Sequence, residues 1–424
     1  MRKVVCVILG GGKGERLFPL TKARAKPAVP FGCRYRIVDI PLSNSIHAGI
    51  KQIFILTQFN SDSLNNHVSS AYQFDTFSRG FVRIMAAKQS LDPLTGWFLG
   101  TADAVRKNFS SFLEQEPDYI MILSGDQLYR MDLDQFLDEH IDSNAEISIA
   151  STPVAKQIAG SLGILSIDKN GFINNFKEKP GEDDISEFKL PEDKVVEVGD
   201  KRKEFLASMG IYIFNTNILK TCLDSDFSDF GKELIPDALN KYKVKGFIYD
   251  GYWEDIGTIR NFYEANLNLA SSYPSFNLYD ELKPIYSKGA ELPPTKMNAC
   301  TFRNALAGEG SIITDAFISN SLVGIRTIID SGASLENVYC MGADWYETDA
   351  QKKENSAKGI PNVGIGAGSI IKNAIIDKNA RIGRNCRIGI DQIERKDFDH
   401  NDYYIRDGII IIGKNSSLSD GTSI

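Results

Sequence analysis

The chain has 424 residues, of which 42% are hydrophobic and 24% charged, and its formal net charge is −7. This composition predicts a soluble globular protein of two or three domains that buries a core without disulfides or metals. A negative chain argues against nucleic acid as a partner, because duplex binding depends on Lys and Arg at the phosphates. No run of residues has transmembrane length, so we expect no membrane association. The six cysteines form no C-x-x-C pair, which favours a reduced, cytoplasmic protein.

One fully apolar run, Val4–Leu9, and two similar runs, Gln52–Thr57 and Tyr119–Ser124, predict central strands of a parallel sheet in the first part of the chain. A helix-like stretch at Thr101–Leu113 lies between the second and the third run. Strands that alternate with helices indicate a doubly wound, mostly parallel α/β sheet. Ligands bind such sheets at the carboxyl ends of the strands, so we expect chemistry just after Leu9 and Ser124.

A charged segment, Gly181–Phe205, interrupts this pattern, and its composition favours a solvated surface insertion. Strand-like and helix-like patterns resume at Leu206 and continue to about Ala270. We therefore predict one α/β domain over residues 1–275.

From about Gly289 the helical periodicity ends and aliphatic residues recur at every sixth position. The members of three such series are Val323, Ile329, Leu335 and Met341; Ile370, Ile376, Ile382 and Ile388; and Ile312 and Ile318. A hexapeptide period is typical of a parallel β-helix in which each aliphatic residue points into one shared core. Tyr346–Asn362 breaks the period and is predicted to leave the coils as an excursion. The second domain is therefore predicted over residues 289–424.

The strand at Val4–Leu9 leads into a glycine-rich loop, Gly-Gly-Gly-Lys-Gly-Glu-Arg-Leu, at residues 10–17. The loop fits neither the Walker A pattern nor the G-x-G-x-x-G fingerprint. A glycine cluster after a strand nevertheless lets backbone N–H groups approach phosphates, and Arg16 and Lys26 add fixed positive charge. A tight turn with basic surface residues explains the loop equally well.

Two carboxylates follow strand-like segments: Asp126, after Gly125, and Asp255, in Trp-Glu-Asp-Ile-Gly. Carboxylate oxygens suit Mg²⁺, although a lone Asp at such a place is more often a cap or turn residue. Lys179 precedes Pro180, which predicts an extended backbone at this lysine. Its alternative interpretation is a surface lysine.

The sequence resembles the sugar nucleotide pyrophosphorylases in a series of motifs that follow the family order. These are GGGxGxRLxPLT from Gly10, RAKPAVP from Arg24, YRIVDIPLSN from Tyr35, LTQF from Leu56, GTADA from Gly100, EKP from Glu178, SMGIY from Ser208, GYWEDIGT from Gly251 and MGADWYETD from Met341. The set is most similar to ADP-glucose pyrophosphorylase, especially its plant and cyanobacterial branch, and covers nearly the whole chain. The resemblance implies a Rossmann-like nucleotide-diphospho-sugar transferase domain followed by a left-handed parallel β-helix.

The implied reaction converts ATP and glucose 1-phosphate to ADP-glucose and pyrophosphate, for the synthesis of glycogen or a starch-type glucan. The resemblance places Gly11 and Gly12 against the nucleotide. It also implies that Arg16 stabilises the leaving pyrophosphate and that Lys26 neutralises the reacting phosphates.

The resemblance further implies a Mg²⁺ cofactor bound by Asp126 and Asp255. Lys179 would bind the phosphate of glucose 1-phosphate, and Glu178 and Ser208 would hydrogen-bond the hydroxyl groups of its sugar. No protein nucleophile is needed, so catalysis would rest on orientation and on cations placed where charge develops.

The family is allosteric and tetrameric, so the resemblance implies a phosphorylated metabolite as activator, such as 3-phosphoglycerate. It also implies a homotetramer, or a heterotetramer with a homologous subunit. The positions that match the activator site are Arg24, Arg36, Arg326, Lys358 and Lys414, and Gln58 matches a position that relays activation. Two further positions that are usually basic are Gln52 and Asn66 here. Lys358 and Lys414 are equally well explained as solvated surface lysines.

Three residues depart from the family pattern. Glu15 replaces a Thr in the glycine-rich loop, Gln127 replaces a His after Asp126, and Leu99 replaces a polar residue that helps to hold adenine. Two alternatives therefore stay open: a catalytically weak regulatory subunit of the same assembly, or an enzyme for another nucleotide. The presence of Arg16 and Lys26 favours activity, because the regulatory subunits tend to lose the equivalent residues.

Overall fold

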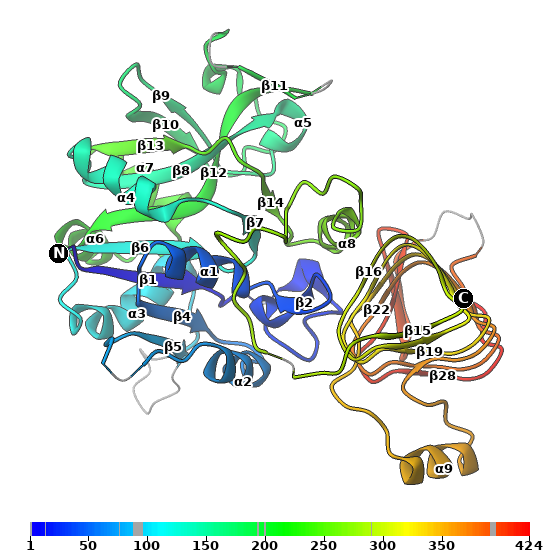
Figure 1. The fold of residues 1–424 in the computed structure, drawn as a ribbon. Coiled ribbons are helices and arrows are strands. Elements are labelled where there is room, and N and C mark those ends of the chain that lie inside the picture. The colour runs from blue at the N-terminus through cyan, green and yellow to red at the C-terminus, as the bar shows by residue number, and fades with distance from the viewer. Residues whose placement is uncertain are drawn as a thin grey trace. The chain divides into compact units, whose positions relative to one another are not determined.

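The structure is a computed structural model that describes residues 2–12, 14–75, 77–87, 96–192, 195–198, 201–289, 291–390 and 396–424 (Figure 1). The chain divides into two compact units, each built from two segments. The first unit comprises Met1–Gly12 and Ile40–Trp253, and the second comprises Lys13–Asp39 and Glu254–Ile424. Among the described residues, no helix combines the length and the apolar character needed to cross a bilayer.

A ten-stranded mixed sheet forms the centre of the first unit, with the order β10-β9-β12-β6-β1-β4-β5 along its main path. Its strands are β1 (Val4–Leu9), β4 (Gln52–Thr57), β5 (Phe81–Ala86), β6 (Tyr119–Ser124), β8 (Ile147–Ala155), β9 (Ile164–Ile167), β10 (Ile173–Lys177), β11 (Val196–Val198), β12 (Lys201–Asn215) and β13 (Val244–Ile248). The run β6-β1-β4-β5 is parallel, and β12 lies antiparallel to β6 and β8. The predicted mostly parallel α/β sheet is confirmed, and β1, β4 and β6 have the predicted bounds.

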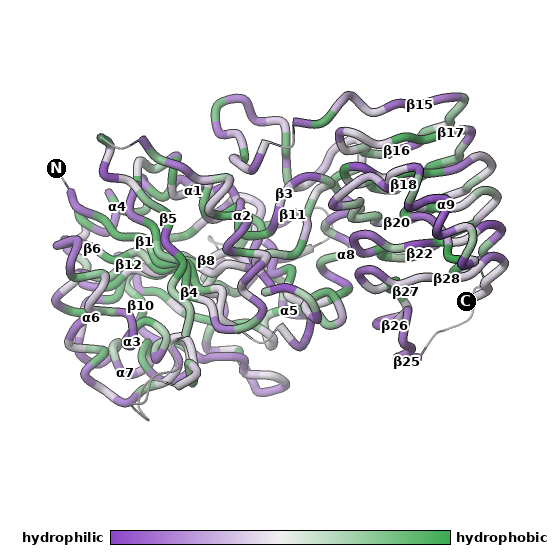
Figure 2. The backbone as a smooth tube through the Cα atoms, turned by 90° about the horizontal axis from the view of Figure 1, so that it is seen from below, coloured by the Kyte–Doolittle hydropathy of each residue, from purple (hydrophilic) through white to green (hydrophobic). Residues whose placement is uncertain are grey.

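The helices of the first unit are α1 (Asp39–His47), α2 (Asp62–Ala71), α3 (Thr101–Leu113), α4 (Leu133–Asp142), α5 (Lys156–Ala159), α6 (Thr216–Leu223), the π-helix η6 (Phe230–Leu234) and α7 (Ile235–Ala238). Helix α3 has the predicted bounds, and α1 begins one residue before the second segment of the unit. Val5 and Val7 of β1 join one apolar cluster with Val105 and Phe112 of α3. The intervening Cys6 is also fully buried, which explains why β1 is an uninterrupted apolar run (Figure 2).

The charged segment Gly181–Phe205 is not a purely solvated insertion, so that prediction was wrong for part of it. The segment contains a short 3₁₀ turn, η4 (Ser186–Phe188), as well as β11 and the start of β12. Ile185 and Phe188 are buried and pack in a small apolar cluster with Phe205. Composition counts the charges but does not show that these few apolar side chains anchor the segment.

The second unit contains two kinds of structure: short elements from residues 15–36 and 259–268, and a stack of β-coils. The first group is η1 (Glu15–Leu17), η2 (Lys26–Ala28), β2 (Pro30–Phe31), β3 (Tyr35–Arg36) and α8 (Ile259–Asn268). The Tyr263 hydroxyl of α8 donates a hydrogen bond to the Asn337 carbonyl of the coils at 2.5 Å. Two further short strands are β7 (Gln127–Tyr129), in the first unit, and β14 (Trp253–Asp255), which begins at the last residue of that unit.

The β-coils pair in parallel along two sheets (Figure 1). One sheet has the order β15 (Lys296–Asn298), β17 (Ile312–Thr314), β19 (Ile328–Ile329), β21 (Gly364–Ile365), β23 (Arg381–Ile382) and β28 (Ser417–Leu418). The other follows β16 (Thr301–Ala307), β18 (Phe317–Val323), β20 (Ser334–Cys340), β22 (Ile370–Ile376) and β27 (Ile409–Ile412), with β24 (Arg387–Ile388) on β22 and a terminal hairpin of β26 (Tyr403–Arg406) and β25 (Phe398–Asp399). The predicted excursion carries α9 (Asp349–Ala357), which begins with a capping box of Thr348 and Gln351.

The six-residue series mark the core of these coils with two exceptions. All four members of the first series are buried, as are Ile318 and three members of the second series. Ile312 is 38% exposed and Ile370 is only half-buried, while their neighbours Ile313 and Ile371 are fully buried. Side chains alternate along a strand, so only one member of an Ile-Ile pair points inward, and the sequence assigned the wrong one.

Candidate active site

The glycine-rich loop begins where β1 ends, in the first unit. The Gly10 N–H donates to the Leu56 carbonyl at the end of β4, at 2.8 Å. A Cβ at Gly11 would lie 3.6 Å from the Phe98 ring, whereas one at Gly12 would meet nothing within 4 Å. Gly11 therefore faces the segment before α3, and Gly12 faces open space.

The segment Gly96–Gly100 forms an apolar platform beside this loop. Trp97 stacks on Phe59 with ring centroids 4.7 Å apart and stays 49% exposed. Leu99 is 81% exposed, so that it and Trp97 together leave apolar surface on this segment. The Phe98 N–H donates to Gln58 Oε1 at 2.8 Å, so the predicted relay residue Gln58 holds this platform from the end of β4. Exposed aromatic and aliphatic surface next to a glycine-rich loop suits the flat face of a nucleotide base.

Asp126 follows β6, as predicted, and lies at the same end of the sheet as the glycine-rich loop. The Gly125 N–H donates to the Leu9 carbonyl at 3.0 Å, and a Cβ at Gly125 would lie 2.8 Å from that oxygen. Asp126 is half-buried, and its Oδ1 accepts a hydrogen bond from the Ser124 hydroxyl at 2.5 Å. The next residue, Gln127, is buried and accepts a hydrogen bond from the Trp253 indole at 3.1 Å.

Glu178 and Ser208 lie on either side of Gly163 in the first unit. The Ser208 N–H donates to the Gly163 carbonyl at 2.7 Å, and a side chain at Gly163 would collide with the Glu178 carboxylate. Burial raises the pKa of Glu178, the adjacent Lys179 opposes this shift, and Asp229 adds to it. Burial also raises the pKa of Tyr212, with the Glu178 charge adding to the rise. The structure thus brings the predicted sugar residues together with Tyr212 and Asp229, which sequence reasoning did not select.

The predicted extended backbone at Lys179 was wrong. Lys179 has a φ of 45°, in the left-handed region that few non-glycine residues adopt. Its N–H donates to the Leu162 carbonyl at 3.1 Å, and the Gly181 N–H donates to the Gly160 carbonyl at 2.9 Å. These two long-range hydrogen bonds fix the turn and override the local preference set by proline. The Lys179 side chain is 55% exposed, with its ammonium 3.6 Å from Glu178 Oε1.

Arg16, Lys26 and Asp255 converge in the second unit, at Gly257. Arg16 Nη2 lies 3.8 Å from Asp255 Oδ2, and the Gly257 N–H donates to Asp255 Oδ1 at 2.9 Å. A Cβ at Gly257 would lie 2.6 Å from Lys26 Nζ, 2.7 Å from Asp255 Oδ1 and 3.3 Å from Arg16 Nη2. The side chain of Arg16 is 61% exposed. Two cations and one carboxylate therefore meet at a place that only glycine leaves free.

The donor chemistry of the two predicted metal ligands fits Mg²⁺. Asp126 and Asp255 both offer carboxylate oxygens, and both are partly buried, as suits a hard cation that keeps water and phosphate ligands. Within each described part of the chain there is no group of three or more His, Cys, Asp or Glu residues that could hold a metal alone.

Arg24, predicted to bind an activator, forms a buried bidentate ion pair in the second unit. Its two terminal nitrogens each lie 2.9 Å from one oxygen of Asp377, and the two side chains are 2% and 3% exposed. Arg36 donates to the Ala28 carbonyl at 3.1 Å. Burial lowers the pKa of Arg36, and the nearby charge of Arg24 lowers it further.

Lys414 belongs to the same cationic cluster, together with Lys378, which sequence reasoning missed. Lys378 Nζ lies 2.7 Å from Asp344 Oδ1, and Lys414 Nζ lies 3.8 Å from Asp344 Oδ2. Burial alone would raise the pKa of Asp344, but Lys378, a hydrogen bond from Asn379 and then Lys414 lower it to about 2. Of the two remaining predicted cations, Lys358 pairs with Glu354 of α9 at 2.6 Å. Arg326 has a left-handed backbone with a φ of 58° and lines a small cavity together with Asp377.

These observations define a protein that joins a doubly wound α/β domain, with a glycine-rich loop and carboxylates at its strand ends, to a β-helix. Residues 5–272 match the family described as Nucleotidyl transferase, and residues 291–423 match the GLGC left-handed parallel beta-helix domain. The predicted left-handed β-helix is thereby confirmed. With both domains in this order, the chain belongs to the ADP-glucose pyrophosphorylase family of nucleotidyl transferases.

Proposed function

We propose that the protein transfers AMP from ATP to glucose 1-phosphate, giving ADP-glucose and pyrophosphate. The observation that carries the proposal is the convergence of Arg16, Lys26 and Asp255 on Gly257. Two cations beside one carboxylate suit a reaction that moves phosphate charge and bound metal together. The family membership supports the same reaction class, and the product would feed glycogen or starch-type glucan synthesis.

In this mechanism an oxygen of the sugar phosphate attacks the α-phosphorus of ATP in line, and pyrophosphate leaves. The base rests on the platform of Trp97 and Leu99, with the phosphates along Gly11 and Gly12. Lys26 neutralises the reacting phosphates, and Arg16 stabilises the charge that develops on pyrophosphate. The work of these groups is orientation and charge stabilisation, because no bond to the protein is formed.

On the acceptor side, Lys179 binds the phosphate of glucose 1-phosphate, and its turned backbone fixes where the ammonium projects. Glu178 and Ser208 orient the sugar through hydrogen bonds to its hydroxyls. Asp126 and Asp255 would hold a magnesium ion, which supplies neutralisation of the phosphate oxygens when bound.

We also propose that residues 1–275 act as the catalytic domain and that residues 289–424 serve assembly and regulation. The cluster of Arg24, Arg36, Lys378 and Lys414 supports binding of a phosphorylated activator, since four cations gather there around three carboxylates, Asp39, Asp344 and Asp377. The proposed activator site also includes Arg326 and Lys358, and the proposed residue that relays activation is Gln58. The expected assembly is a cytoplasmic tetramer of the plant and cyanobacterial type, either of one subunit or with a homologous partner.

Leu99 supports a second candidate function, a nucleotidyl transferase that prefers another nucleotide. Its side chain is 81% exposed on the base platform and cannot hydrogen-bond adenine. Glu15, exposed beside Arg16, supports a catalytically weak regulatory subunit. The presence of both Arg16 and Lys26 favours the active enzyme over this last reading.

The proposal is tested by pyrophosphate release from ATP, glucose 1-phosphate and Mg²⁺ in the wild-type chain and in Lys179→Ala. Loss of the ammonium that binds the phosphate should raise KM for glucose 1-phosphate by about 10- to 150-fold, in line with a charged hydrogen bond worth about 1.5–3 kcal/mol. The KM for ATP should stay within about twofold of wild type. Equal effects on both KM values would place Lys179 outside the acceptor site.

A further inference from the structure

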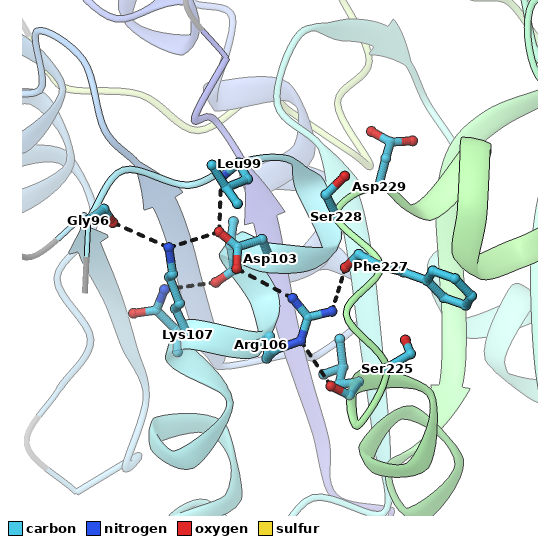
Figure 3. A network of polar contacts seen from close by, with 12 residues as sticks. Gly96, Leu99, Asp103, Arg106, Lys107, Ser225, Phe227, Ser228 and Asp229 are labelled. Carbon is cyan, nitrogen blue, oxygen red and sulfur yellow. Dashed lines mark hydrogen bonds and ion pairs between the residues drawn. The ribbon is translucent and has the colours of Figure 1, made fainter. Parts of the chain in front are cut away.

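Asp103 is a buried carboxylate on the first turn of α3, and the proposed mechanism does not use it. It is 6% exposed, and its Oδ2 accepts a hydrogen bond from the Leu99 N–H at 2.9 Å. Lys107 Nζ lies 2.9 Å from the same oxygen, and Arg106 Nη1 lies 3.3 Å from Oδ1 (Figure 3). Two cationic partners and a backbone N–H offset the cost of burying this carboxylate. The carboxylate in turn holds all three partners in place.

On one side, Asp103 and its partners hold the base platform. Lys107 Nζ donates to the Trp97 carbonyl at 3.0 Å and also reaches the Gly96 carbonyl at 3.4 Å. Gln58 accepts a hydrogen bond from the Phe98 N–H, and Asp103 accepts one from the Leu99 N–H. Side chains therefore hold the backbone of all four consecutive residues 96–99 of the platform. The exposed faces of Trp97 and Leu99 are presented from a backbone that cannot shift without breaking these bonds.

On the other side, Arg106 holds the segment that follows α6. Its Nε donates to the Leu223 carbonyl at 2.9 Å. Its Nη2 donates to the Phe227 carbonyl (Figure 3). The N-terminus of α3 has no side-chain cap; instead the Ser228 carbonyl accepts hydrogen bonds from the N–H groups of Ala102 and Asp103, at 2.9 and 3.2 Å. The first turn of α3 and residues 223–228 are therefore interlocked.

The interlocked segment continues to the sugar site. Thr101 Oγ1 donates to Asp229 Oδ2 at 3.2 Å and accepts a hydrogen bond from the Phe230 N–H at 3.0 Å. A Cβ at Gly231 would lie 2.6 Å from the Glu178 carboxylate, so this backbone packs directly against a proposed sugar ligand. A continuous set of contacts thus runs from the base platform through the first turn of α3 to Glu178.

We infer that Asp103 is a positioning residue that couples the two substrate sites of the reaction. Its carboxylate fixes the base platform, and through Arg106 and the first turn of α3 it fixes the segment that packs on Glu178. Occupation of the platform by a nucleotide then favours the arrangement that binds glucose 1-phosphate, and the reverse holds equally because coupling is reciprocal. The inference rests on the proposed function, since it takes the nucleotide and the sugar phosphate as the two ligands.

Isothermal titration provides the test, because binding can be followed without turnover. The dissociation constant of glucose 1-phosphate is measured with Mg²⁺, with and without saturating α,β-methylene-ATP, which cannot be cleaved at the reacting bond. The ratio of the two constants is the coupling factor, expected to be about 5-fold or more in the wild type. In Asp103→Asn, an isosteric change, the factor should fall to about 1 and the nucleotide should bind about tenfold more weakly.

Glu264→Gln is the matched control, since Glu264 also pairs with a cation one helical turn away, Arg260, at 3.4 Å, but on α8 in the second unit. It should keep both constants and the coupling factor. Thr101→Val removes the two hydrogen bonds to residues 229 and 230 and should lower the coupling factor while nucleotide affinity stays unchanged. This variant also carries the test if Asp103→Asn fails to fold.

A coupling factor in both Asp103→Asn and Thr101→Val that stays within about twofold of wild type overturns the inference. A wild-type factor near 1 overturns it as well. Failure of the proposed function is a separate outcome, because it appears as absent pyrophosphate release while the coupling of the two ligands persists and is still lost in the variants.

Discussion

Replacing Gly257 with alanine should damage catalysis while sparing the fold. The new methyl group would lie 2.6 Å from Lys26 Nζ and 2.7 Å from Asp255 Oδ1, where ordinary contacts begin at 3.4 Å. Both groups are the far ends of side chains, so they can retreat, but by about 0.8 and 0.7 Å respectively. The φ angle of Gly257 is not in the positive range, so alanine meets no backbone strain there.

The size of the effect follows from these displacements. A misplacement of about 1 Å in a catalytic group costs roughly 100-fold in rate, which corresponds to about 2.7 kcal/mol of transition-state stabilisation. The free energy of unfolding should change by less than about 1 kcal/mol, because the methyl group displaces only flexible charged ends. We therefore expect a large loss of kcat and a nearly unchanged thermal transition.

The assay is steady-state pyrophosphate release with both substrates saturating, accompanied by a melting curve. Gly289→Ala is the control, since a Cβ at Gly289 would meet nothing within 4 Å. A Gly257→Ala variant with wild-type kcat would refute the reasoning, because it would mean that Arg16, Lys26 and Asp255 can move without consequence. A collapse of the melting temperature would contradict it equally.

Three further outcomes are expected. Arg24→Ala leaves the carboxylate of Asp377 buried without its partner, so denaturant unfolding should show a loss of about 3–5 kcal/mol, most of which Arg24→Met with Asp377→Leu should recover. His140 hydrogen-bonds Ser148 and Asn215, and burial lowers its pKa below the ordinary value of about 6.5. Just below that pH the unfolded chain binds more protons than the folded chain, so the free energy of unfolding should fall as the pH drops below about 6.5. His140→Gln should flatten this slope. Chelation with EDTA should abolish pyrophosphate release and added Mg²⁺ should restore it, with Asp126→Asn requiring more Mg²⁺ than wild type.

The contradicting results are equally specific for each of these. A loss below about 1 kcal/mol in Arg24→Ala would mean that water reaches Asp377. An unchanged pH slope in His140→Gln would assign the acid sensitivity to other groups. Full activity in EDTA would remove the role proposed for Asp126 and Asp255.

Sequence periodicity predicted the frame of this protein because local patterns determine it. The strands β1, β4 and β6 are buried on both faces, so each is a short apolar run that a single sequence displays. The β-helix repeats its core residue every six positions, which is also a local signal. The predicted core positions of the β-helix were wrong only at Ile312 and Ile370, where two adjacent isoleucines left the inward-pointing residue ambiguous.

The parts of the site that could not be predicted depend on contacts between distant residues. Arg24 bonds to Asp377, 353 positions away, and Gly257 matters because Lys26 approaches it from another segment. The left-handed turn at Lys179 follows from hydrogen bonds to residues 160 and 162, against the preference set by the next proline. For Asp103 the signal was present in the GTADA motif, but its spacing gave no indication of the loops on either side.

The most direct test of the central claim is glucose 1-phosphate-dependent pyrophosphate release by the purified chain alone, with Mg²⁺, offered ATP, UTP, GTP and dTTP in separate reactions, with and without 3-phosphoglycerate. The account predicts turnover with ATP only, stimulated by 3-phosphoglycerate. Turnover with another nucleotide would show that Leu99 marks a different base site. No turnover with any nucleotide would contradict the stand-alone enzyme and leave the regulatory subunit as the function to pursue.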